Sequence, residues 1–294
     1  MATVQRQYRT AVFDTGRWEG FSHRPGDIFV CTPPKCGTTW TQTIVANLLW
    51  PRGDVPGPIL AISPWIEFTL TPAAEMHEML AAQPHRRFMK SHTPADGIPW
   101  FDTARYIVVA RDGRDAFMSL CNHLENFRND VRESMNAQAG DGVPHLDGWD
   151  GDIHGFFSKW LAEDDILLHH IASFWAHRHQ PNVLLVHFND LKADLEGEMR
   201  RIAGFLQVDI PEERWPALVA ACTFESMRAR GSQIGPFEML FEGGAQSFIF
   251  KGTNGRWRDV LTPVELAAYE RRVAETLSPD AAAWLERGRS ALAT

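Results

Sequence analysis

The chain has 294 residues, 44% of them hydrophobic, which is enough to bury the core of one large α/β domain. Its formal net charge of -8 at pH 7 argues against general nucleic-acid binding, because a phosphate backbone demands a broad basic surface. Its four cysteines lack both paired CxxC spacing and the density of a secreted disulfide scaffold, so we expect reduced thiols and no structural zinc.

Four short apolar segments, each followed by polar or turn residues, predict the strands of a sheet. They cover residues 27–32, 86–90, 105–110 and 183–187. Helical periodicity lies between them: Trp40, Ile44 and Leu48, for example, share one helix face after the first strand. Strands that alternate with helices predict a single α/β domain over residues 1–294, with a central parallel sheet flanked by helices. Ligands of such sheets bind at the carboxyl ends of the strands.

The first predicted strand leads into the sequence PPKCGTTW at residues 33–40. A tight turn at a helix N-terminus leaves amide N–H groups unpaired and partly positive, which suits an anion. Gly37 permits close approach of the backbone, and Lys35 adds a full positive charge. The hydroxyl groups of Thr38 and Thr39 add further donors. A capped helix with a solvated lysine is the alternative, but the coincidence of these residues favours a P-loop-like phosphate site.

The position of the lysine distinguishes between two kinds of phosphate loop. The nucleoside triphosphate loop has its lysine after the last glycine, whereas Lys35 precedes Gly37. The sequence PKCGTTW instead resembles the 5′-phosphosulfate loop of the cytosolic-type sulfotransferases, with Cys36 in place of serine. The resemblance implies 3′-phosphoadenosine 5′-phosphosulfate (PAPS) as donor, 3′,5′-adenosine bisphosphate (PAP) as product, and no metal. It implies donor contacts from Lys35, Cys36, Gly37, Thr38, Thr39 and Trp40.

The second predicted strand ends in KSHTP, residues 90–94. A histidine with an ordinary pKa of roughly 6.5 can be neutral near pH 7 and accept a hydroxyl proton. The segment resembles the family's Lys-Thr-His-Leu-Pro, which implies that His92 is the catalytic base. Lys90 is then expected to stabilise the sulfuryl oxygens, and Lys35 the leaving phosphate of an in-line transfer.

The third predicted strand ends at Arg111, where a guanidinium group needs an anionic partner. Ser119 lies opposite the apolar stripe of the helix that follows, so we do not expect it in the core. The family reads Val-Ala-Arg here, with a serine eight residues beyond the arginine. The resemblance therefore implies that Arg111 and Ser119 bind the donor's 3′-phosphate.

Residues 126–153 form the only long polar and Gly-rich interval of the sequence. Such an interval is typical of an exposed loop rather than of a domain boundary. We therefore predict a mobile surface segment, or lid, inserted into the single sulfotransferase domain.

Two later segments extend the resemblance to the adenine. The fourth strand leads into VHFNDL, residues 186–191, where Phe188 replaces a family tyrosine that lies near the adenine. The segment CTFESM, residues 222–227, resembles the family's Thr-Ser-Phe-x-x-Met. Core packing is the alternative role for aromatic residues at helical positions. The adenine contacts implied by the resemblance are Trp40, Phe188, Thr223, Phe224 and Met227.

The sequence FIFKGTNGRW, residues 248–257, resembles the family's Arg-Lys-Gly-x-x-Gly-x-Trp and implies donor contacts from Lys251 and Gly252. Phe250 stands where the family has an arginine on the 3′-phosphate. We expect Arg111, Ser119 and Lys251 to satisfy this phosphate, with Arg256 or Arg258 as further candidates.

The expected partner is a small molecule with a hydroxyl group. Aromatic side chains that lined an apolar pocket would favour a phenol, sterol or hydroxylated lipid as the acceptor, although core packing explains such side chains equally well. The longest apolar runs are too short to span a bilayer, and the N-terminus lacks a basic segment followed by an apolar one. We therefore expect a cytoplasmic monomer or homodimer without a membrane partner. The candidate pocket residues are Trp65, Phe68, Trp100, Phe127 and Trp149.

Two other functions fit parts of this sequence. A nucleotide or small-molecule kinase would use Asp112 and Asp115 to hold magnesium, but the position of Lys35 argues against it. A catalytically impaired nucleotide-binding protein of the same fold would explain Phe250, but His92 is present.

Overall fold

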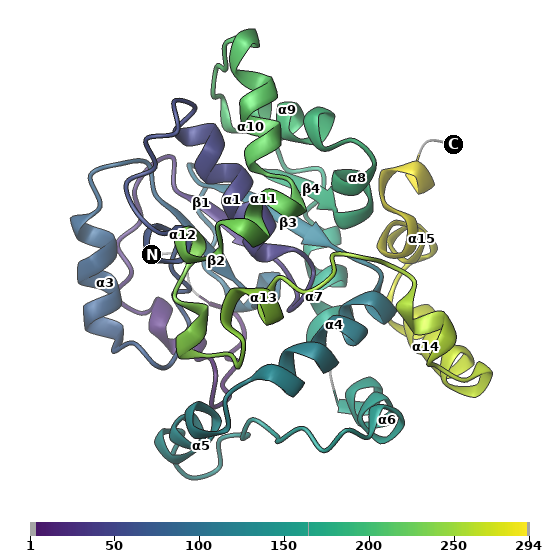
Figure 1. Cartoon of the computed structure of the whole chain (residues 1–294). Helices are drawn as coiled ribbons and strands as arrows, with labels where there is room; N and C mark the ends of the chain where they lie inside the picture. The colour runs from purple at the N-terminus through teal and green to yellow at the C-terminus, as the bar shows by residue number, and fades with distance from the viewer. Residues whose placement is uncertain (1–3, 164, 293–294) are drawn as a thin grey trace.

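A computed structural model describes residues 4–163 and 165–292 of the chain. Its centre is a parallel sheet of four strands in the order β2-β1-β3-β4 (Figure 1). The strands are β1 (Ile28–Cys31), β2 (Phe88–Ser91), β3 (Arg105–Ala110) and β4 (Val183–His187). Helices flank this sheet, so the predicted α/β fold with a central parallel sheet is confirmed.

Helices follow the strands as the periodicity predicts, with α1 (Thr38–Leu49) after β1 and α4 (Gly113–Asn126) after β3. In the described part of the chain, no helix combines the length and the apolar character that crossing a membrane requires. Short 3-10 helices cover Thr15–Trp18, Ala95–Gly97, Glu212–Arg214, Phe237–Met239, Arg256–Asp259 and Gly288–Leu292. The other α-helices are α2 (Ile59–Ile62), α3 (Ala73–Ala82), α5 (Asn129–Gln138), α6 (Ile153–Glu163), α7 (Asp165–Trp175), α8 (Phe188–Ala193), α9 (Leu195–Leu206), α10 (Trp215–Ala221), α11 (Phe224–Ala229), α12 (Gly231–Ile234), α13 (Gly244–Phe248), α14 (Pro263–Thr276) and α15 (Pro279–Arg287).

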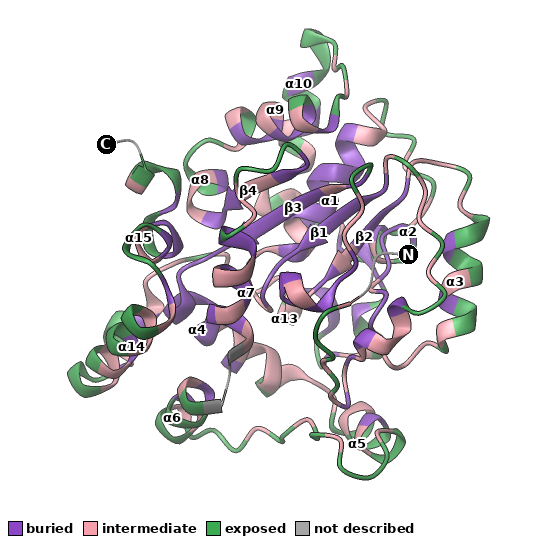
Figure 2. Cartoon of the chain, turned by 180° about the vertical axis from the view of Figure 1, so that it is seen from behind, coloured by how far each residue is buried: buried purple, intermediate pink, exposed green. Residues whose placement is uncertain are grey.

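Residues of the central strand alternate between two apolar layers, as the two-residue period of a strand requires. Ile28 and Val30 pack in one layer with Ile44 of α1, whereas Phe29 and Cys31 belong to the layer on the opposite face. All four residues of β1 are buried, and Figure 2 shows the strands buried between their covering helices. A sheet covered on both faces is typical of parallel strands.

The strand order reverses at β1, and this reversal fixes where a ligand can bind. Val30 of β1 is in register with Lys90 of β2 on one side and with Ile107 of β3 on the other. Ligands of open parallel sheets bind outside the carboxyl ends of the strands at such a reversal. The segment PPKCGTTW follows β1 directly and therefore lies at this position.

The polar interval 126–153 contains α5, a helix that the sequence analysis did not predict, followed by mostly exposed coil. Met135 of α5 is buried, and with Leu146 it lines the cavity described below. A β-bridge between Phe127 and Phe241 ties the start of the interval to the segment before α13. The interval therefore covers part of the cavity in addition to contributing exposed surface.

Candidate active site

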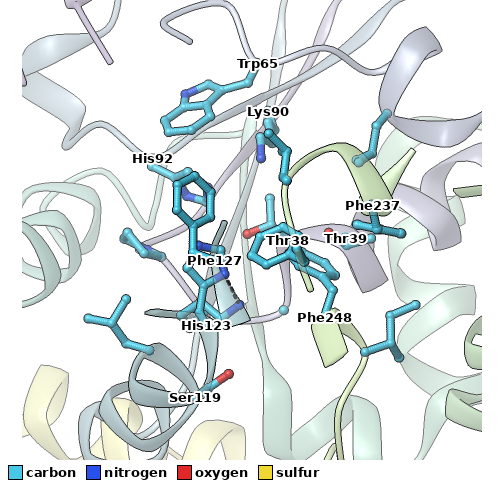
Figure 3. Close-up of a pocket in the computed structure, with 18 of the residues that line it drawn as sticks. Thr38, Thr39, Trp65, Lys90, His92, Ser119, His123, Phe127, Phe237 and Phe248 are labelled. Carbon is cyan, nitrogen blue, oxygen red and sulfur yellow. Dashed lines mark hydrogen bonds between the residues drawn. The ribbon is translucent and has the colours of Figure 1, made fainter. Parts of the chain in front are cut away.

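A cavity of ≈ 870 Å³ opens at the carboxyl ends of β1, β2 and β3. Its lining includes Lys35 from the loop after β1, Lys90 and His92 from the end of β2, and Arg111 from the end of β3. Figure 3 shows Lys90 and His92 facing the same space as Ser119 of α4. Side chains predicted from separate segments of the sequence thus meet in one place.

The loop after β1 has the backbone of an anion-binding turn. Lys35 and Gly37 adopt left-handed conformations, with φ of 68° and 101°. The amide of Thr41 donates to the Gly37 carbonyl at 3.0 Å. The amides that come before Thr41 in the first turn of α1 therefore have no hydrogen-bond partner within the helix. A Cβ atom on Gly37 would lie 3.0 Å from the Phe188 ring, so glycine also permits the close approach of α8. The positive end of the helix dipole makes this turn favourable for an anion.

The ammonium group of Lys35 lies inside the cavity between an imidazole and an aromatic ring. Its Nζ is 3.0 Å from His123 Nδ1 and 4.7 Å from the centroid of the Phe248 ring. Burial, followed by the charges of Lys90 and Arg111, lowers the pKa of Lys35 to about 7. A negative ligand at this position would relieve the repulsion and hold the lysine in its charged form.

His92 is held by the backbone in one tautomer. Its Nδ1 lies 2.8 Å from the Thr32 carbonyl oxygen, which can only accept, so Nδ1 carries the hydrogen and Nε2 keeps its lone pair. Burial, and then the charge of Lys90, lowers the pKa of His92 well below its usual value. The ring also packs edge-on against Trp65, with 4.8 Å between centroids. A neutral imidazole with a free Nε2 is the arrangement that a general base needs.

Lys90 lies over the face of Trp65, with Nζ 4.6 Å from the ring centroid. Burial lowers the pKa of Lys90 to about 8, while the carboxyl group of Glu67 raises it. Glu67 is fully buried and accepts hydrogen bonds from Ser91 and Thr93 at 2.5 and 3.1 Å. This carboxyl group was not predicted to contribute to the site, and it balances part of the positive charge at the end of β2.

Arg111 is oriented by groups that lie far from it in the sequence. Its Nη2 donates to Asn254 Oδ1 at 2.8 Å and to the Thr253 carbonyl at 3.0 Å. Its guanidinium carbon lies 4.2 Å from the centroid of the Phe188 ring. The guanidinium group is therefore fixed against the cavity wall, where Ser119 also lies.

Basic side chains surround Phe250, where the family resemblance leads us to expect an arginine. Lys251 Nζ lies 4.8 Å and Arg256 Cζ 5.6 Å from the centroid of the Phe250 ring. Arg256 Nη2 donates to the Met118 carbonyl at 3.1 Å, and both basic residues line the cavity. Burial lowers the pKa of Arg111, and the charge of Arg256 lowers it further, so the two guanidinium groups are close enough to repel. Positive charge is thus present around this ring.

The residues expected near an adenine mostly share the same wall. Trp40 packs edge-on against Phe188 with centroids 5.2 Å apart, and its Nε1 donates to the Cys222 carbonyl at 2.8 Å. Phe224 lies against Gly252, where a Cβ atom would come within 2.7 Å of the ring. Of the expected adenine contacts, Trp40, Phe188, Phe224 and Met227 line the cavity. Gly252, which was expected to contact the donor, lines it as well, as do Thr38 and Thr39 of the phosphate loop.

Some predicted side chains lie elsewhere. Cys36 is fully buried, and Thr223 caps α11 by accepting a hydrogen bond from the Ser226 amide at 3.2 Å. Neither side chain is among the cavity-lining residues of the described chain. Trp65, Phe68 and Phe127 do line the cavity, whereas Trp100 and Trp149 do not. Trp100 donates instead to the Ala95 carbonyl at 2.9 Å, and Trp149 packs against Phe156.

His123 and Asn254 are site residues that sequence reasoning missed. His123 lies one helical turn beyond Ser119 on α4, and this spacing is the one sequence feature that would have placed it on the same face. Asn254 lies in a loop and is brought to Arg111 only by the tertiary fold. The predicted base and lysines stand at fixed positions of local motifs, whereas Asn254 occupies a variable position of the segment FIFKGTNGRW.

The carboxylates suggested for a kinase have structural partners. Asp112 pairs with Arg114 at 2.6 Å, and Asp115 accepts a hydrogen bond from the Gly255 amide at 2.6 Å. Among residues 4–163 and 165–292, no group of three histidine, cysteine or acidic residues is placed to hold a metal ion. These contacts give the kinase alternative no support.

Comparison with known proteins agrees with this geometry. The family model described as "Sulfotransferase domain" matches residues 25–279. A glycolipid sulfotransferase of Mycobacterium tuberculosis is 32% identical over 308 residues, covering 96% of this chain and 94% of that protein. Sulfotransferase 1A1 of Rattus norvegicus is 25% identical over 274 residues, covering 90% of this chain and 88% of that protein.

Solved structures share the fold. A mouse sulfotransferase, SULT7A1, solved as a complex with PAP, has a TM-score of 0.68 at 20% identity, covering 95% of this chain and 91% of its own. Retinol dehydratase in complex with androsterone and PAP has a TM-score of 0.67 at 23% identity, covering 91% and 87%. Both support a single α/β domain built on the observed sheet.

Proposed function

The chain belongs to the sulfotransferase family, and on this premise we propose that it moves a sulfuryl group from PAPS to a hydroxyl group of an apolar small molecule. The observation that carries the proposal is the convergence of Lys35, Lys90 and His92 on one cavity whose lining also contains Arg111. Two lysines and a neutral imidazole supply what sulfuryl transfer needs: positive charge for the leaving phosphate, and a base for the acceptor hydroxyl.

The cavity lining fits a donor with two anionic ends. Lys35 experiences repulsion from Lys90 and Arg111, which an anion would relieve. We assign the 5′-phosphosulfate to the loop at residues 33–40 and the 3′-phosphate to Arg111 and Ser119. Lys251 and Arg256 add charge at the 3′ end. When bound, PAPS supplies an activated sulfuryl group with a phosphate as leaving group.

The adenine contacts are assigned to the aromatic wall formed by Trp40, Phe188, Phe224 and Met227. Flat rings and a thioether on one wall suit a purine, whose faces stack on aromatic groups. Thr223 contributes by capping α11, which carries Phe224. Cys36, which is fully buried, contributes to the packing of the phosphate loop.

The transfer follows from the orientation of the three catalytic residues. Nε2 of His92 takes the proton of the acceptor hydroxyl as its oxygen forms a bond to sulfur. The bond from sulfur to the bridging phosphate oxygen breaks in line with this attack, and Lys35 stabilises the charge that develops on that oxygen. Lys90 stabilises the sulfuryl oxygens.

The acceptor half of the cavity favours an apolar body. Trp65 packs against both His92 and Phe68, and Phe127 lies against Phe241 with centroids 5.5 Å apart. Exposed Met239, at 68% accessibility, also lines the cavity, so the apolar path reaches the surface. A hydroxylated lipid or sterol would bury its apolar part along this path. The glycolipid sulfotransferase relative supports an acceptor of this kind.

We propose that the whole chain acts as one domain and that residues 126–153 act as a lid. Met135 and Leu146 supply apolar contacts from this interval to the cavity. An acceptor of the proposed class would add contacts to both residues. A location in the cytoplasm and a monomeric or homodimeric state remain predictions from the sequence.

The proposal is tested by incubating the protein with PAPS and one acceptor each from the phenols, sterols and long-chain alcohols. Mass spectrometry should detect a sulfated apolar alcohol and an equal amount of PAP. The double variant Lys35→Ala with His92→Ala is the control for transfer without the protein's catalytic groups. Lack of transfer to all three classes, together with equal calorimetric affinities for PAP and 5′-AMP, would contradict the proposal.

A further inference from the structure

His123 lies in the cavity lining, but the transfer mechanism described above assigns it no role. It projects from α4, and Figure 3 shows it on the same side of the cavity as His92 and Phe127. Its Nδ1 lies 3.0 Å from Nζ of Lys35, so the imidazole lies next to a group of the transfer mechanism. A second histidine beside the reacting groups therefore needs an explanation.

The hydrogen bonds of the two imidazoles fix them in opposite tautomers. When a bound anion keeps Lys35 charged, its ammonium group can only donate, so Lys35 Nζ, 3.0 Å from His123 Nδ1, makes that nitrogen an acceptor. A neutral His123 then carries its hydrogen on Nε2. His92 has the reverse arrangement, because the Thr32 carbonyl takes its Nδ1 hydrogen. His92 thus presents a lone pair at Nε2, and His123 presents a hydrogen at Nε2.

The surroundings of His123 keep it neutral and leave its N–H group among apolar rings. Burial, and then the charges of Lys35 and Lys90, lowers the pKa of His123 well below its usual value. The ring is stacked on Phe127 at 5.8 Å and meets Phe241 edge-on at 4.8 Å between centroids. Within the described chain, the hydrogen bond of this imidazole is the one at Nδ1. A donor in such surroundings gains most from an oxygen that the ligand brings.

We propose that His123 selects acceptors that carry a second oxygen next to the reacting hydroxyl, such as a vicinal diol or a sugar headgroup on an apolar tail. The inference rests on the proposed function. The reacting hydroxyl donates to Nε2 of His92, and the neighbouring oxygen accepts from Nε2 of His123. The apolar tail then follows Phe127 and Phe241. His123 is in this sense a specificity-determining residue.

A matched pair of acceptors isolates this contact. 1,2-Dodecanediol and 1-dodecanol share a tail and differ in the second hydroxyl. We expect the wild type to prefer the diol in kcat/KM, and His123→Phe to lower the ratio of diol to alcohol by about ten-fold. Any effect of the lost Lys35 contact acts on both acceptors and cancels in the ratio. His123→Gln, which keeps an N–H donor, should restore part of the preference.

Phe127→Leu is the control, because it alters the same wall without removing a donor. This variant should change kcat/KM by the same factor for the diol and for the alcohol. Calorimetry with the two alcohols, on the PAP-loaded wild type and on His123→Phe, measures binding without turnover. The ratio of the affinity for the diol to the affinity for the alcohol should fall in the variant. Nitrogen NMR of labelled histidine should find the hydrogen on Nε2 in His123 and on Nδ1 in His92.

The outcomes separate the two proposals. If both alcohols are sulfated and His123→Phe leaves their ratio unchanged, the inference about His123 is wrong and the proposed function stands. A hydrogen on Nδ1 of His123 in the PAP-loaded protein would also overturn the inference. If neither alcohol nor any phenol or sterol receives sulfate, the proposed function fails, and the binding ratio and the tautomer still decide the role of His123.

Discussion

Arg111 Nη2 donates a hydrogen bond to Asn254 Oδ1 at 2.8 Å, although 143 residues separate the two in the sequence. Arg111 Nε lies 3.2 Å from the same oxygen, and Asn254 donates in turn to Asn189 Oδ1 at 2.6 Å. The guanidinium group is thereby held in position by the loop that follows α13. A change at Asn254 would alter the orientation of a charge without removing it.

Asn254→Ala is therefore expected to weaken PAP binding by roughly two- to ten-fold, because the guanidinium group of Arg111 keeps its charge but loses the contacts that orient it. The effect on 5′-AMP should be smaller, because that nucleotide lacks the 3′-phosphate assigned to Arg111. Calorimetry with both nucleotides measures the difference. Equal losses for the two would mean that Asn254 supports the loop in general rather than the orientation of Arg111.

His92→Ala is expected to lower kcat by roughly 10² or more while leaving PAP affinity nearly unchanged, because a general base acts in the transition state. His179→Ala, at an exposed histidine outside the cavity lining, is the matched control. Stopped assays for kcat and calorimetry for PAP give the two values. Normal turnover in the variant would remove His92 from its catalytic role.

Lys35 makes nucleotide binding depend on pH. Its pKa of about 7 means that the free protein loses this positive charge as pH rises through neutrality. A bound anion favours the charged form, so PAP affinity should fall between about pH 6 and pH 9, with proton uptake on binding at the upper end. Calorimetry in buffers of different ionisation enthalpy detects this uptake.

Lys35→Ala should weaken both binding and turnover and flatten the pH dependence, and Lys35→Arg should flatten it while retaining charge. In both variants Lys90, with a pKa of about 8, would still give PAP affinity a weaker dependence on pH at higher pH. If Lys35→Ala reduced thermal stability alone, with PAP affinity and turnover intact, Lys35 would have a structural role only.

Phe250→Arg tests whether positive charge is missing at the 3′ end. Lys251 and Arg256 already lie beside the Phe250 ring, so we expect a gain in PAP affinity of less than about three-fold. Arg256→Ala should instead weaken PAP relative to 5′-AMP by about ten-fold, the value of a charge-assisted hydrogen bond. A ten-fold gain from Phe250→Arg would mean that the arginine's place is vacant. A wild type that binds the two nucleotides equally would contradict the assigned 3′-phosphate site.

The parts of the site that could be predicted are those encoded in short segments. The loop at residues 33–40 follows a buried strand, and its lysine, glycine and threonines stand next to one another in the sequence. His92 and Lys90 lie in one pentapeptide at the end of β2. Because parallel strands end at the same edge, the convergence of these segments followed from the predicted topology.

Contacts between distant segments could not be predicted. His123 meets Lys35 across 88 residues, and its role depends on a hydrogen-bond direction that only coordinates give. Aromatic residues were ambiguous for another reason. Trp65 lines the cavity, whereas Trp100 packs against Tyr106. Burial of an indole ring is favourable both in a core and in a pocket wall, so the sequence does not distinguish the two positions.

Lys35 has one further consequence, which comes from its backbone rather than its charge. A φ of 68° is unfavourable for a side chain with a Cβ atom, by roughly 1 kcal/mol, and glycine avoids this cost. Lys35→Gly should therefore raise the free energy of unfolding by about 1 kcal/mol while abolishing the binding contribution of the ammonium group. At this position stability and activity favour different residues, and a search for more heat-resistant variants that ignored turnover would select the inactive one.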